Sequence, residues 1–340
     1  MTKTPEQQDA PNNKNQLGIF YHPRYNISFL GVENLHPFDS KKYGRAFKLL
    51  RKTHGKKFDK LCIAPQHPAN EHSLRLVHTA EYLKSLKSAE KVESILELPP
   101  IRLLGNRIID HRVLRPMRLA TEGTIMAVRH ALQYGMAINL SGGYHHANPK
   151  FGEGFCVYND IGIAIASAIK TGHLTKDAYV AYIDLDAHQG NGVARVFLKS
   201  PNVRLFDMFN AHIYPGDTVA QRRLNCKLPL YTGVSDPTYL DILESELPKF
   251  LDDMGDSIAL AVYNAGTDVL AGDPLGFMSV SAEGILKRDL FVFETLKERG
   301  IPWAMVTSGG YTQESHRIIA RTVGEAIDRW GAPDETARTE

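Results

Sequence analysis

The stretch that decides the fold runs from Tyr179 to Asn191 and reads Y-V-A-Y-I-D-L-D-A-H-Q-G-N. Its first half is rich in β-branched and aromatic residues, which predicts a short buried strand, and the helix-like segment that follows predicts a parallel βα unit. Successive side chains of a strand point to opposite faces, so Asp184, Asp186 and His188 should share one side as far as the extended backbone lasts. The sequence therefore gathers polar side chains at the carboxyl end of a strand, where open parallel sheets bind ligands.

These polar side chains have two interpretations. Asp186 and His188 can bind one cation together, or the aspartates can cap the next helix while His188 is an ordinary loop residue. Burying such groups without partners would cost several kcal/mol. A bound cation is therefore the better explanation of their alternate spacing.

The length and charge of the chain limit the possible partners. A single large α/β domain can reach 340 residues. We expect one domain at 17–330, after a polar, disordered leader at 1–16 and before a flexible tail at 331–340. With 40 basic and 38 acidic residues the formal charge is +2. No overall field therefore favours nucleic acid or a membrane surface as a partner.

The cysteines Cys62, Cys156 and Cys226 lie far apart and form no C-x-x-C pair. This spacing argues against a disulfide framework and a thiolate zinc site, and is typical of a reducing compartment. The leader has no apolar signal-peptide core, and no uncharged apolar run is long enough to span a bilayer. We expect a soluble cytoplasmic protein, with access to the nucleus if its source is eukaryotic.

Strand-like and helix-like segments alternate along the chain. Apolar runs predict strands near 17–21, 136–140, 180–183, 203–209, 258–263 and 301–307. Helical spacing and stop signals predict helices near 40–54, 72–98, 116–134, 160–170, 192–198, 238–254 and 281–299, and a closing helix that ends near Trp330. This alternation predicts an α/β fold with a mainly parallel sheet.

Further polar residues follow other expected strands. S-G-G-Y-H-H-A-N delivers His145 and His146 after the second strand, and its glycine pair allows a tight turn. Adjacent histidines are more often unrelated surface residues, but their place at a strand end makes them acid/base candidates. Asp268 follows the fifth strand, although backbone amides alone can satisfy a loop aspartate, as we expect for Asp273.

Two tyrosines lie on expected loops. Tyr311 follows the glycine pair of T-S-G-G-Y after the last strand, where it is either a hydroxyl donor or an ordinary, partly buried tyrosine. Tyr214 lies in N-A-H-I-Y-P-G-D at 210–217, as pocket wall or as part of a turn. For His212 of the same loop we expect the turn.

Asp186, His188 and Asp268 offer three nitrogen and oxygen ligands and leave a coordination position open, which describes a catalytic zinc site. Fe(II), Co(II) or Mn(II) would accept the same ligands. Two carboxylates cancel the formal charge of a divalent cation, so bound water is acidified less strongly and a nearby histidine base is useful. With Tyr311 donating to an oxyanion, these parts suit hydrolysis of an amide.

Six ordered motifs carry a family resemblance: S-G-G-Y-H-H, G-F-C-V-Y-N-D, D-L-D-A-H-Q-G-N-G, Y-P-G-D, N-A-G-T-D-V-L-A-G-D and T-S-G-G-Y. In order and spacing they resemble the zinc-dependent histone deacetylases of the arginase/deacetylase superfamily. H-P-R-Y-N and L-H-P-F-D near the N-terminus make the class IV branch the most similar. The resemblance covers about 17–330. It implies a single doubly wound domain on an eight-stranded, mainly parallel sheet flanked by helices.

The resemblance implies a role for each matching residue at the reaction centre. One catalytic Zn²⁺ would be bound by three residues: Asp186, His188 and Asp268. His146 would act as general base and then as general acid, with His145 as its electrostatic partner. Tyr311 would donate to the oxyanion.

The resemblance also implies supporting roles. Asp184 would orient His145 and help to bind a structural K⁺. The acyl-lysine tunnel would be lined by Phe155 and Tyr214, with the Gly154 carbonyl and Leu275 nearby.

Asn191 departs from the class I pattern, in which a second aspartate lies behind the general base; class II and class IV members have asparagine there. A neutral amide can orient His146 but does not favour its charged form as a carboxylate would. We therefore expect His146 to titrate at a lower pH than in an aspartate-backed site.

The activity that the resemblance implies is removal of acyl groups, acetyl or longer fatty acyl, from Nε-acyl-lysine in proteins. A deacetylase of acetylpolyamines or other small amides would use the same tunnel chemistry. An arginase-like enzyme is disfavoured because two metals need more aspartates. A non-catalytic acyl-lysine binding module is disfavoured because all the proposed catalytic residues are present.

Overall fold

The computed structural model describes residues 16–27, 39, 41–97, 101–255 and 257–331. One sheet has the strand order β2-β1-β3-β8-β7-β4-β5-β6, and every pairing between neighbours is parallel. Its strands are β1 Gln16–Phe20, β2 Cys62–Ile63, β3 Gly135–Asn139, β4 Tyr179–Asp184, β5 Val203–Asn210, β6 Cys226–Leu230, β7 Ile258–Asn264 and β8 Trp303–Val306. The expected α/β class with an eight-stranded sheet is confirmed. Nearly all of the expected leader and tail, and most of the L-H-P-F-D motif, lie outside the described residues.

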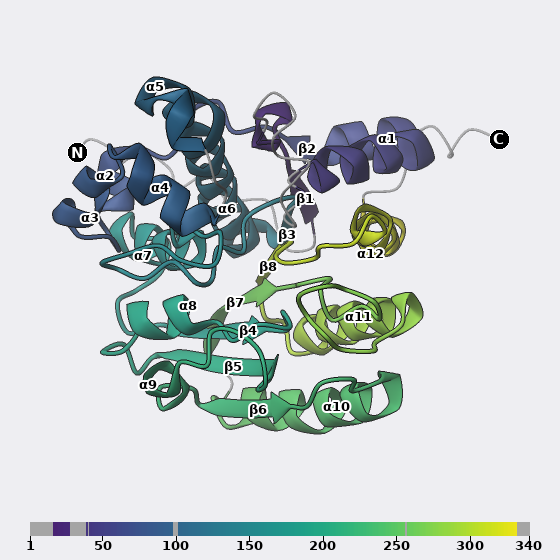
Figure 1. Ribbon diagram of the computed structural model, residues 1–340. Helices are drawn as coiled ribbons and strands as arrows, with labels where there is room; N and C mark the ends of the chain where they lie inside the picture. Colours follow the sequence, from purple (N-terminus) through teal and green to yellow (C-terminus); the bar gives the residue numbers. More distant parts are fainter. Residues whose placement is uncertain (1–15, 28–38, 40, 98–100, 256, 332–340) are drawn as a thin grey trace, which may run out of the picture.

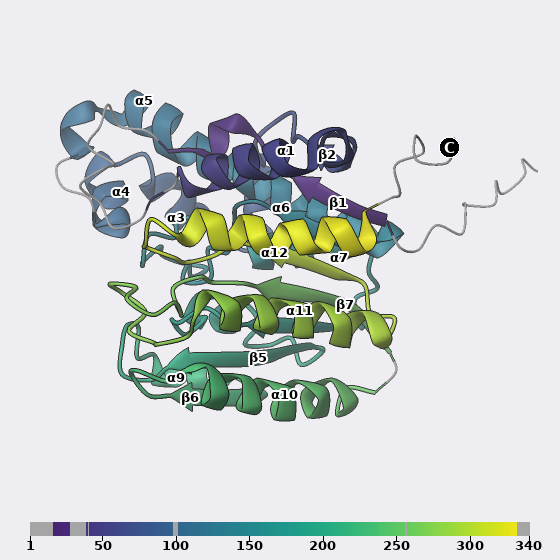
Figure 2. The same ribbon diagram turned by 90° about the vertical axis from the view of Figure 1, so that its right-hand side faces the viewer.

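Helices cover both faces of the sheet (Figure 1). One layer contains α6 Arg115–Tyr134, α7 Asp160–Lys170, α8 Asn191–Val196 and the short α9 Thr218–Gln221. The other contains α1 Lys42–Leu61, α12 Ser315–Trp330, α11 Ala282–Glu298 and α10 Asp236–Asp252, which lie side by side in that order in Figure 2. Shorter helices gather beside α6 and α7: α2 Glu71–Leu74, α3 Ala80–Ser85, α4 Ala89–Leu96 and α5 Asn106–Ile109. Single helical turns occur at Pro23–Tyr25, Ile101–Leu104 and Asp110–Leu114.

The central strands are buried on both faces, which explains why they are continuous apolar runs. In β4 every residue after Tyr179 is buried, and β8 is buried from end to end. A parallel sheet covered by helices on both sides exposes neither face to water, so its strands do not alternate between apolar and polar residues. Across the described ranges, no helix combines the length and apolar character needed to cross a bilayer.

Two helical predictions were wrong in extent. The single helix expected at 72–98 is divided into α2, α3 and α4. Thr79 and Ser88 start new helices there, since their side chains accept hydrogen bonds from the backbone N–H groups of Tyr82 and Lys91. The helix expected near 40–54 continues to Leu61, across Gly55, whose φ of 50° interrupts the helical backbone.

The two edge strands were missed by the sequence prediction. β2 has only two residues, and β6 alternates between partly buried and exposed positions and contains Pro229. An edge strand pairs with a neighbour on one side only, so it can tolerate proline and needs no continuous apolar run. The pattern that reveals a central strand is therefore absent from both.

The strand order brings distant loops together. β3, β8, β7 and β4 are consecutive neighbours in the middle of the sheet, because β7 and β8 insert between β3 and β4. All strands are parallel, so the loops that follow these four leave the sheet at the same edge. The predicted metal ligands, the histidine pair and Tyr311 follow these same strands, and Tyr214 follows the adjacent β5.

Arg288 of α11 joins two of these loops. Its side chain is fully buried, and Nη1 donates to the carbonyl oxygens of Leu185 after β4 (3.0 Å) and Gly266 after β7 (2.7 Å). Its Nε donates to Asp289 at 2.8 Å. The buried guanidinium therefore fixes the spacing between the loops that follow β4 and β7.

We predict that Arg288→Ala lowers the free energy of unfolding by about 3–5 kcal/mol, because Asp289 and two loop carbonyls lose their buried partner. Arg299→Ala is the matched control. Arg299, just past the end of the same helix, pairs with an exposed Asp252, and its loss should cost about 1 kcal/mol or less. Denaturant unfolding followed by circular dichroism measures both. Equal losses would contradict the supporting role of Arg288.

Candidate metal and catalytic site

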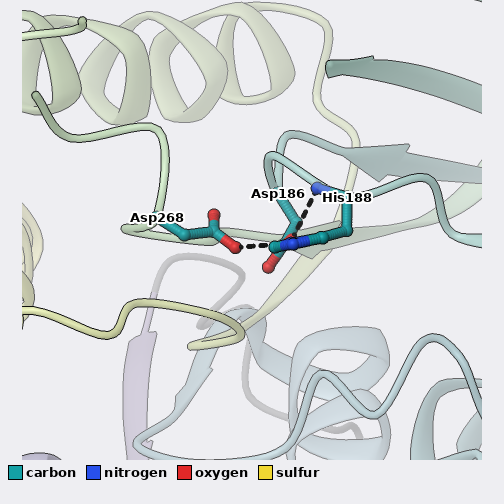
Figure 3. Close-up of side chains that lie close together, drawn as sticks. All are labelled: Asp186, His188 and Asp268. Atoms are coloured by element: carbon teal, nitrogen blue, oxygen red, sulfur yellow. Dashed lines mark hydrogen bonds and ion pairs between the residues drawn. The ribbon is translucent and has the colours of Figure 1, made fainter. Parts of the chain in front are cut away.

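The three predicted ligands meet at the carboxyl edge of the sheet (Figure 3). β4 ends at Asp184, so Asp186 and His188 lie on the loop that follows it, and Asp268 lies on the loop after β7. All three ligands are buried, and their ligand atoms lie within 4.8 Å of one another. His188 Nδ1 lies 3.1 Å from Asp186 Oδ1 and 3.0 Å from Asp268 Oδ2.

Backbone N–H groups hold the two carboxylates in place. Asp186 Oδ2 accepts a hydrogen bond from Gly309 N–H at 2.8 Å, and Asp268 Oδ1 accepts one from Ala187 N–H at 2.9 Å. A side chain at Gly309 would press against both carboxylates, so this position requires glycine. Each aspartate thus has one oxygen anchored and the other directed at His188.

The buried charges of this cluster favour a cation. Burial, and then the neighbouring Asp186 charge, raises the pKa of Asp268 to about 7. Burial opposes the charged form of His188, but Asp186 and Asp268 outweigh it and raise the pKa of His188 to about 10. Two carboxylates and one imidazole nitrogen are ligands of Zn²⁺ and similar ions, and a divalent cation would compensate both negative charges. The donor set therefore fits a metal ion.

The loop after β3 carries the histidine pair. Asp160, the first residue of α7, accepts hydrogen bonds from the backbone N–H groups of Gly143 (3.1 Å) and Tyr144 (2.8 Å). This contact fixes the glycine turn. It delivers His145 and His146 to the same edge as the metal ligands, with a distance of 4.1 Å between their ring centres.

Each histidine has a different partner at Nδ1. His145 Nδ1 lies 2.8 Å from Asp184 Oδ2, and His146 Nδ1 lies 2.8 Å from Asn191 Oδ1. The predicted orienting residues Asp184 and Asn191 are therefore both in contact with the histidines assigned to them. The His146 ring centre lies 5.9 Å from that of His188, which places the pair beside the metal ligands.

These partners give the two histidines different charges. Burial opposes the charged form of His145, but Asp184 and Asp186 raise its pKa to about 9. Burial lowers the pKa of His146 well below its ordinary value, and the charges of His145 and His188 lower it further. At neutral pH His145 is thus a cation and His146 is neutral, which is the division that an electrostatic partner and a general base require.

Asp184 is the centre of a buried hydrogen-bond network. Besides contacting His145, it accepts hydrogen bonds from the Tyr182 hydroxyl at 2.5 Å and from Asn264 Nδ2 at 2.8 Å. Asp207, its register partner on β5, is also buried. Burial and the Asp184 charge raise the pKa of Asp207 well above its usual range. Two carboxyl groups are therefore buried side by side here, and without a cation between them one of the two is favoured in its protonated form.

Aromatic rings lie beside the catalytic candidates. The Tyr311 ring centre lies 6.1 Å from that of His188 and 6.1 Å from that of Phe155. The Tyr214 ring centre lies 5.0 Å from that of His146. Three of the predicted aromatic residues thus surround the histidine side of the site.

Gly154 and Leu275 are the two remaining predicted tunnel residues. Gly154 lies against His146, since a Cβ atom there would come within 2.6 Å of His146 Cδ2. Leu275 is linked to the site through Asp273, which accepts hydrogen bonds from the N–H groups of Leu275 (3.0 Å) and Tyr311 (2.8 Å). Asp273 is therefore a loop aspartate satisfied by backbone amides, as expected. His212 lies in a turn, also as expected.

Several supporting residues were missed by the sequence analysis. Asn264 had a usable signal, since it ends β7 as Asp184 ends β4. Lys42 had none, because a lysine near a helix start is normally solvated. It is buried here, and Nζ donates to the carbonyl oxygens of Ser308, Gly309 and Gly310 at 2.7, 2.9 and 3.1 Å. It thus holds the loop that leads to Tyr311.

The parallel sheet and the buried Asp–His–Asp set at its carboxyl edge define the class of protein, an α/β protein with a candidate metal centre. A histone deacetylase domain model matches residues 36–327. Histone deacetylase 2 of Arabidopsis thaliana is 40% identical over 323 residues, which cover 95% of this chain and 81% of that protein. The chain therefore belongs to the histone deacetylase family and is a hydrolase of the lysine deacetylase type.

Solved structures agree with this fold. A histone deacetylase homologue from Aquifex aeolicus has a TM-score of 0.72 at 22% identity and covers 93% of this chain and 84% of that chain. A histone deacetylase homologue complexed with SAHA has a TM-score of 0.71 at 24% identity and covers 94% of this chain and 84% of that chain. At these identities the likeness shows the fold alone. The class IV placement stays a prediction.

We predict that the metal-free protein is stabilised by Zn²⁺. At a hundredfold excess over Kd the gain in unfolding free energy is about 2.7 kcal/mol, because only the folded state assembles the three ligands. Asp268→Asn should lose most of this gain, whereas Asp252→Asn, at an exposed aspartate, should keep it. Thermal unfolding with zinc and with chelator, combined with metal analysis, measures the effect. An Asp268→Asn variant that binds zinc as tightly as the wild type would exclude this ligand set.

Proposed function

We propose that this enzyme is a Zn²⁺-dependent amidohydrolase that removes acyl groups from Nε-acyl-lysine in proteins or peptides. The observation that carries the proposal is the placement of His145, in contact with Asp184, and His146, in contact with Asn191, beside the Asp–His–Asp set. A neutral base and a fixed positive charge next to a metal-binding set suit amide hydrolysis. Zinc is the proposed ion because the family is zinc-dependent and the ligands are nitrogen and oxygen.

In the proposed mechanism His146 moves the proton. Asp186, His188 and Asp268 would hold the ion, which when bound polarises the acyl carbonyl and acidifies the attacking water. His146 Nδ1 is engaged with Asn191, so Nε2 accepts the proton of the water as the attack begins. Because the pKa of His146 is low, the proton is then passed readily to the leaving lysine nitrogen.

His145 and Tyr311 stabilise the developing negative charge. Asp184 keeps His145 protonated and fixes its ring beside that of His146. Burial raises the pKa of the Tyr311 hydroxyl well above its usual range, so the hydroxyl keeps its proton at neutral pH and can donate to the oxyanion.

We also propose that Phe155, Tyr214, Leu275 and the Gly154 carbonyl line an acyl-lysine tunnel. The contacts of Phe155 with Tyr311 and of Tyr214 with His146 support this proposal, because both rings flank the catalytic candidates. The methylene stem of a lysine is apolar, so flanking rings would exclude water from the reacting amide.

A structural K⁺ beside Asp184 is a further part of the proposal. Asp184 and Asp207 are buried neighbours on β4 and β5, and Asp207 Oδ1 accepts no hydrogen bond from the described residues. Two carboxylates in this position favour a cation between them. Asp184 would then serve both the ion and His145.

The proposed location is cytoplasmic, which agrees with three cysteines in the free thiol form. The proposed catalytic domain is 17–330, and the family match at 36–327 supports it. Acetyl and longer fatty acyl groups are both proposed substrates, and acetylpolyamines are the main alternative.

We predict that the zinc-loaded protein hydrolyses acyl-lysine peptides and that chelator abolishes the reaction. A panel of peptides with increasing acyl length, together with acetylpolyamines, gives kcat/KM for each substrate. His146→Ala should lower kcat at least about a hundredfold with zinc still bound, because the general base is lost. His212→Ala, in an exposed turn, is the matched control. Full turnover by His146→Ala would refute the mechanism, and turnover of acetylpolyamines alone would favour the small-molecule alternative.

We predict that Asn191→Asp moves the acidic limb of the pH–rate profile to higher pH, by about one unit or more. His146 must be neutral to act as base, so activity falls as the pH drops through its pKa, and a carboxylate at position 191 raises that pKa. Profiles of kcat/KM at constant ionic strength measure the shift. Asn106→Asp, at an exposed asparagine, controls for added charge alone. An unmoved limb would argue against His146 as the group that titrates.

A further inference from the structure

The side-chain amide of Asn191 contacts two residues of the site. Its Oδ1 lies 2.8 Å from His146 Nδ1, and its Nδ2 donates to Glu153 Oε1 at 2.8 Å. Glu153 lies on the loop before Phe155 and is only partly exposed. The three side chains form a continuous hydrogen-bonded chain that ends in a carboxylate.

We propose that Glu153 is a positioning residue that fixes the orientation of the Asn191 amide and, through it, the tautomer of His146. This inference rests on the proposed function. The two ends of an asparagine amide have almost the same shape, but one donates hydrogen bonds and the other accepts them. A carboxylate only accepts. Glu153 therefore keeps the NH₂ group of Asn191 on its own side and the amide oxygen on the side of His146.

The orientation of this amide decides whether His146 can act as a base. With the oxygen facing it, His146 carries its proton on Nδ1 and keeps a lone pair on Nε2. With the NH₂ group facing it, Nδ1 would have to accept, and the proton would move to Nε2. That tautomer cannot take a proton from water at Nε2. A flipped Asn191 would thus inactivate His146 without moving it.

The backbone of Glu153 belongs to a hydrogen-bonded turn beside His146. Its carbonyl oxygen accepts a hydrogen bond from Cys156 N–H at 2.9 Å, which closes the turn that contains Gly154. A Cβ atom on Gly154 would come within 2.6 Å of His146 Cδ2, so the turn lies directly against the base. The Tyr214 ring packs against the same turn, since a Cβ atom on Gly154 would also come within 3.0 Å of Tyr214 Cε1. Glu153 therefore lies between Asn191 and a proposed wall of the tunnel.

A carboxylate in this place has one rival role, direct contact with the substrate. The two roles have different kinetic signatures. Loss of a substrate contact raises KM, whereas loss of the correct tautomer reduces the fraction of competent enzyme and lowers kcat with KM little changed.

The test compares Glu153→Ala, Glu153→Gln and the control Lys150→Ala, an exposed residue of the same loop, in the zinc-loaded protein with an acyl-lysine peptide. We expect kcat to fall about tenfold in Glu153→Ala, with KM and zinc content unchanged. In Glu153→Gln kcat should fall by a smaller factor, because a glutamine amide accommodates either orientation of Asn191. Lys150→Ala should match the wild type. A change confined to KM would assign Glu153 to substrate binding and overturn the proposal.

A double-mutant cycle and a spectroscopic measurement complete the test. If Glu153 acts through Asn191, the double variant Asn191→Ala/Glu153→Ala should have the same kcat as Asn191→Ala within about twofold. Imidazole ¹⁵N spectra of metal-free, histidine-labelled protein, assigned with His146→Ala, should show a protonated Nδ1 in the wild type and a mixture in Glu153→Gln. Additive losses, or an unchanged tautomer in both Glu153 variants, would overturn the proposal.

These outcomes separate the inference from the proposed function. An inactive wild type whose His146 tautomer still depends on Glu153 would remove the proposed activity and keep the positioning role. An active wild type whose kcat and tautomer are indifferent to Glu153 would remove only the inference. Should Glu153→Ala fail to fold, Glu153→Gln alone decides the question through its spectrum and its kcat.

Discussion

The burial of four aspartate side chains at the carboxyl edge of the sheet is the constraint on which the rest of the structure depends. Asp184, Asp186, Asp207 and Asp268 are each no more than 1% exposed, and a buried carboxylate without a partner is strongly destabilising. Part of the charge on these aspartates is compensated by backbone N–H groups, the Asn264 amide and buried histidines. A cation at the Asp–His–Asp set would compensate the remainder. The fit of the site to a metal ion is thus a consequence of how the fold buries its aspartates.

The buried polar groups also give two adjacent histidines different charges. His145 and His146 are neighbours in the chain and in space, and burial acts on both in the same direction. The difference lies behind the rings, where His145 contacts the carboxylate of Asp184 and His146 contacts the amide of Asn191. A carboxylate stabilises an imidazolium, whereas an amide orients an imidazole and leaves it neutral. The division of roles in the proposed mechanism therefore depends on the residue behind each ring. Asp184 has two carboxylate oxygens, whereas Asn191 has one oxygen and one NH₂ group.

Local sequence patterns predicted the central strands and the polar residues that follow them, and this success has a physical reason. A strand buried on both faces is an apolar run, so the polar residues that follow it, as Asp186 and His188 follow β4, are conspicuous. The rule fails for β6, whose alternate residues are exposed. Glu153 and Lys42 were not predicted from the sequence, for another reason. Their partners Asn191 and Ser308 are 38 and 266 positions away, and no local pattern encodes such contacts.

Those long-range contacts also hold the loops of the site in place. Burial lowers the pKa of Lys42 to about 8, so the fold accepts an unfavourable buried cation that holds the loop before Tyr311. Phe155 has a φ of 63°, a left-handed conformation that costs a residue with a side chain about 1–2 kcal/mol. It persists because its N–H donates to Ile95 at 3.2 Å and its ring contacts Tyr311. A backbone conformation of this kind is retained only where the surrounding contacts hold the residue in it. On the proposed function, the oxyanion donor and the tunnel wall would therefore be in position before a substrate binds.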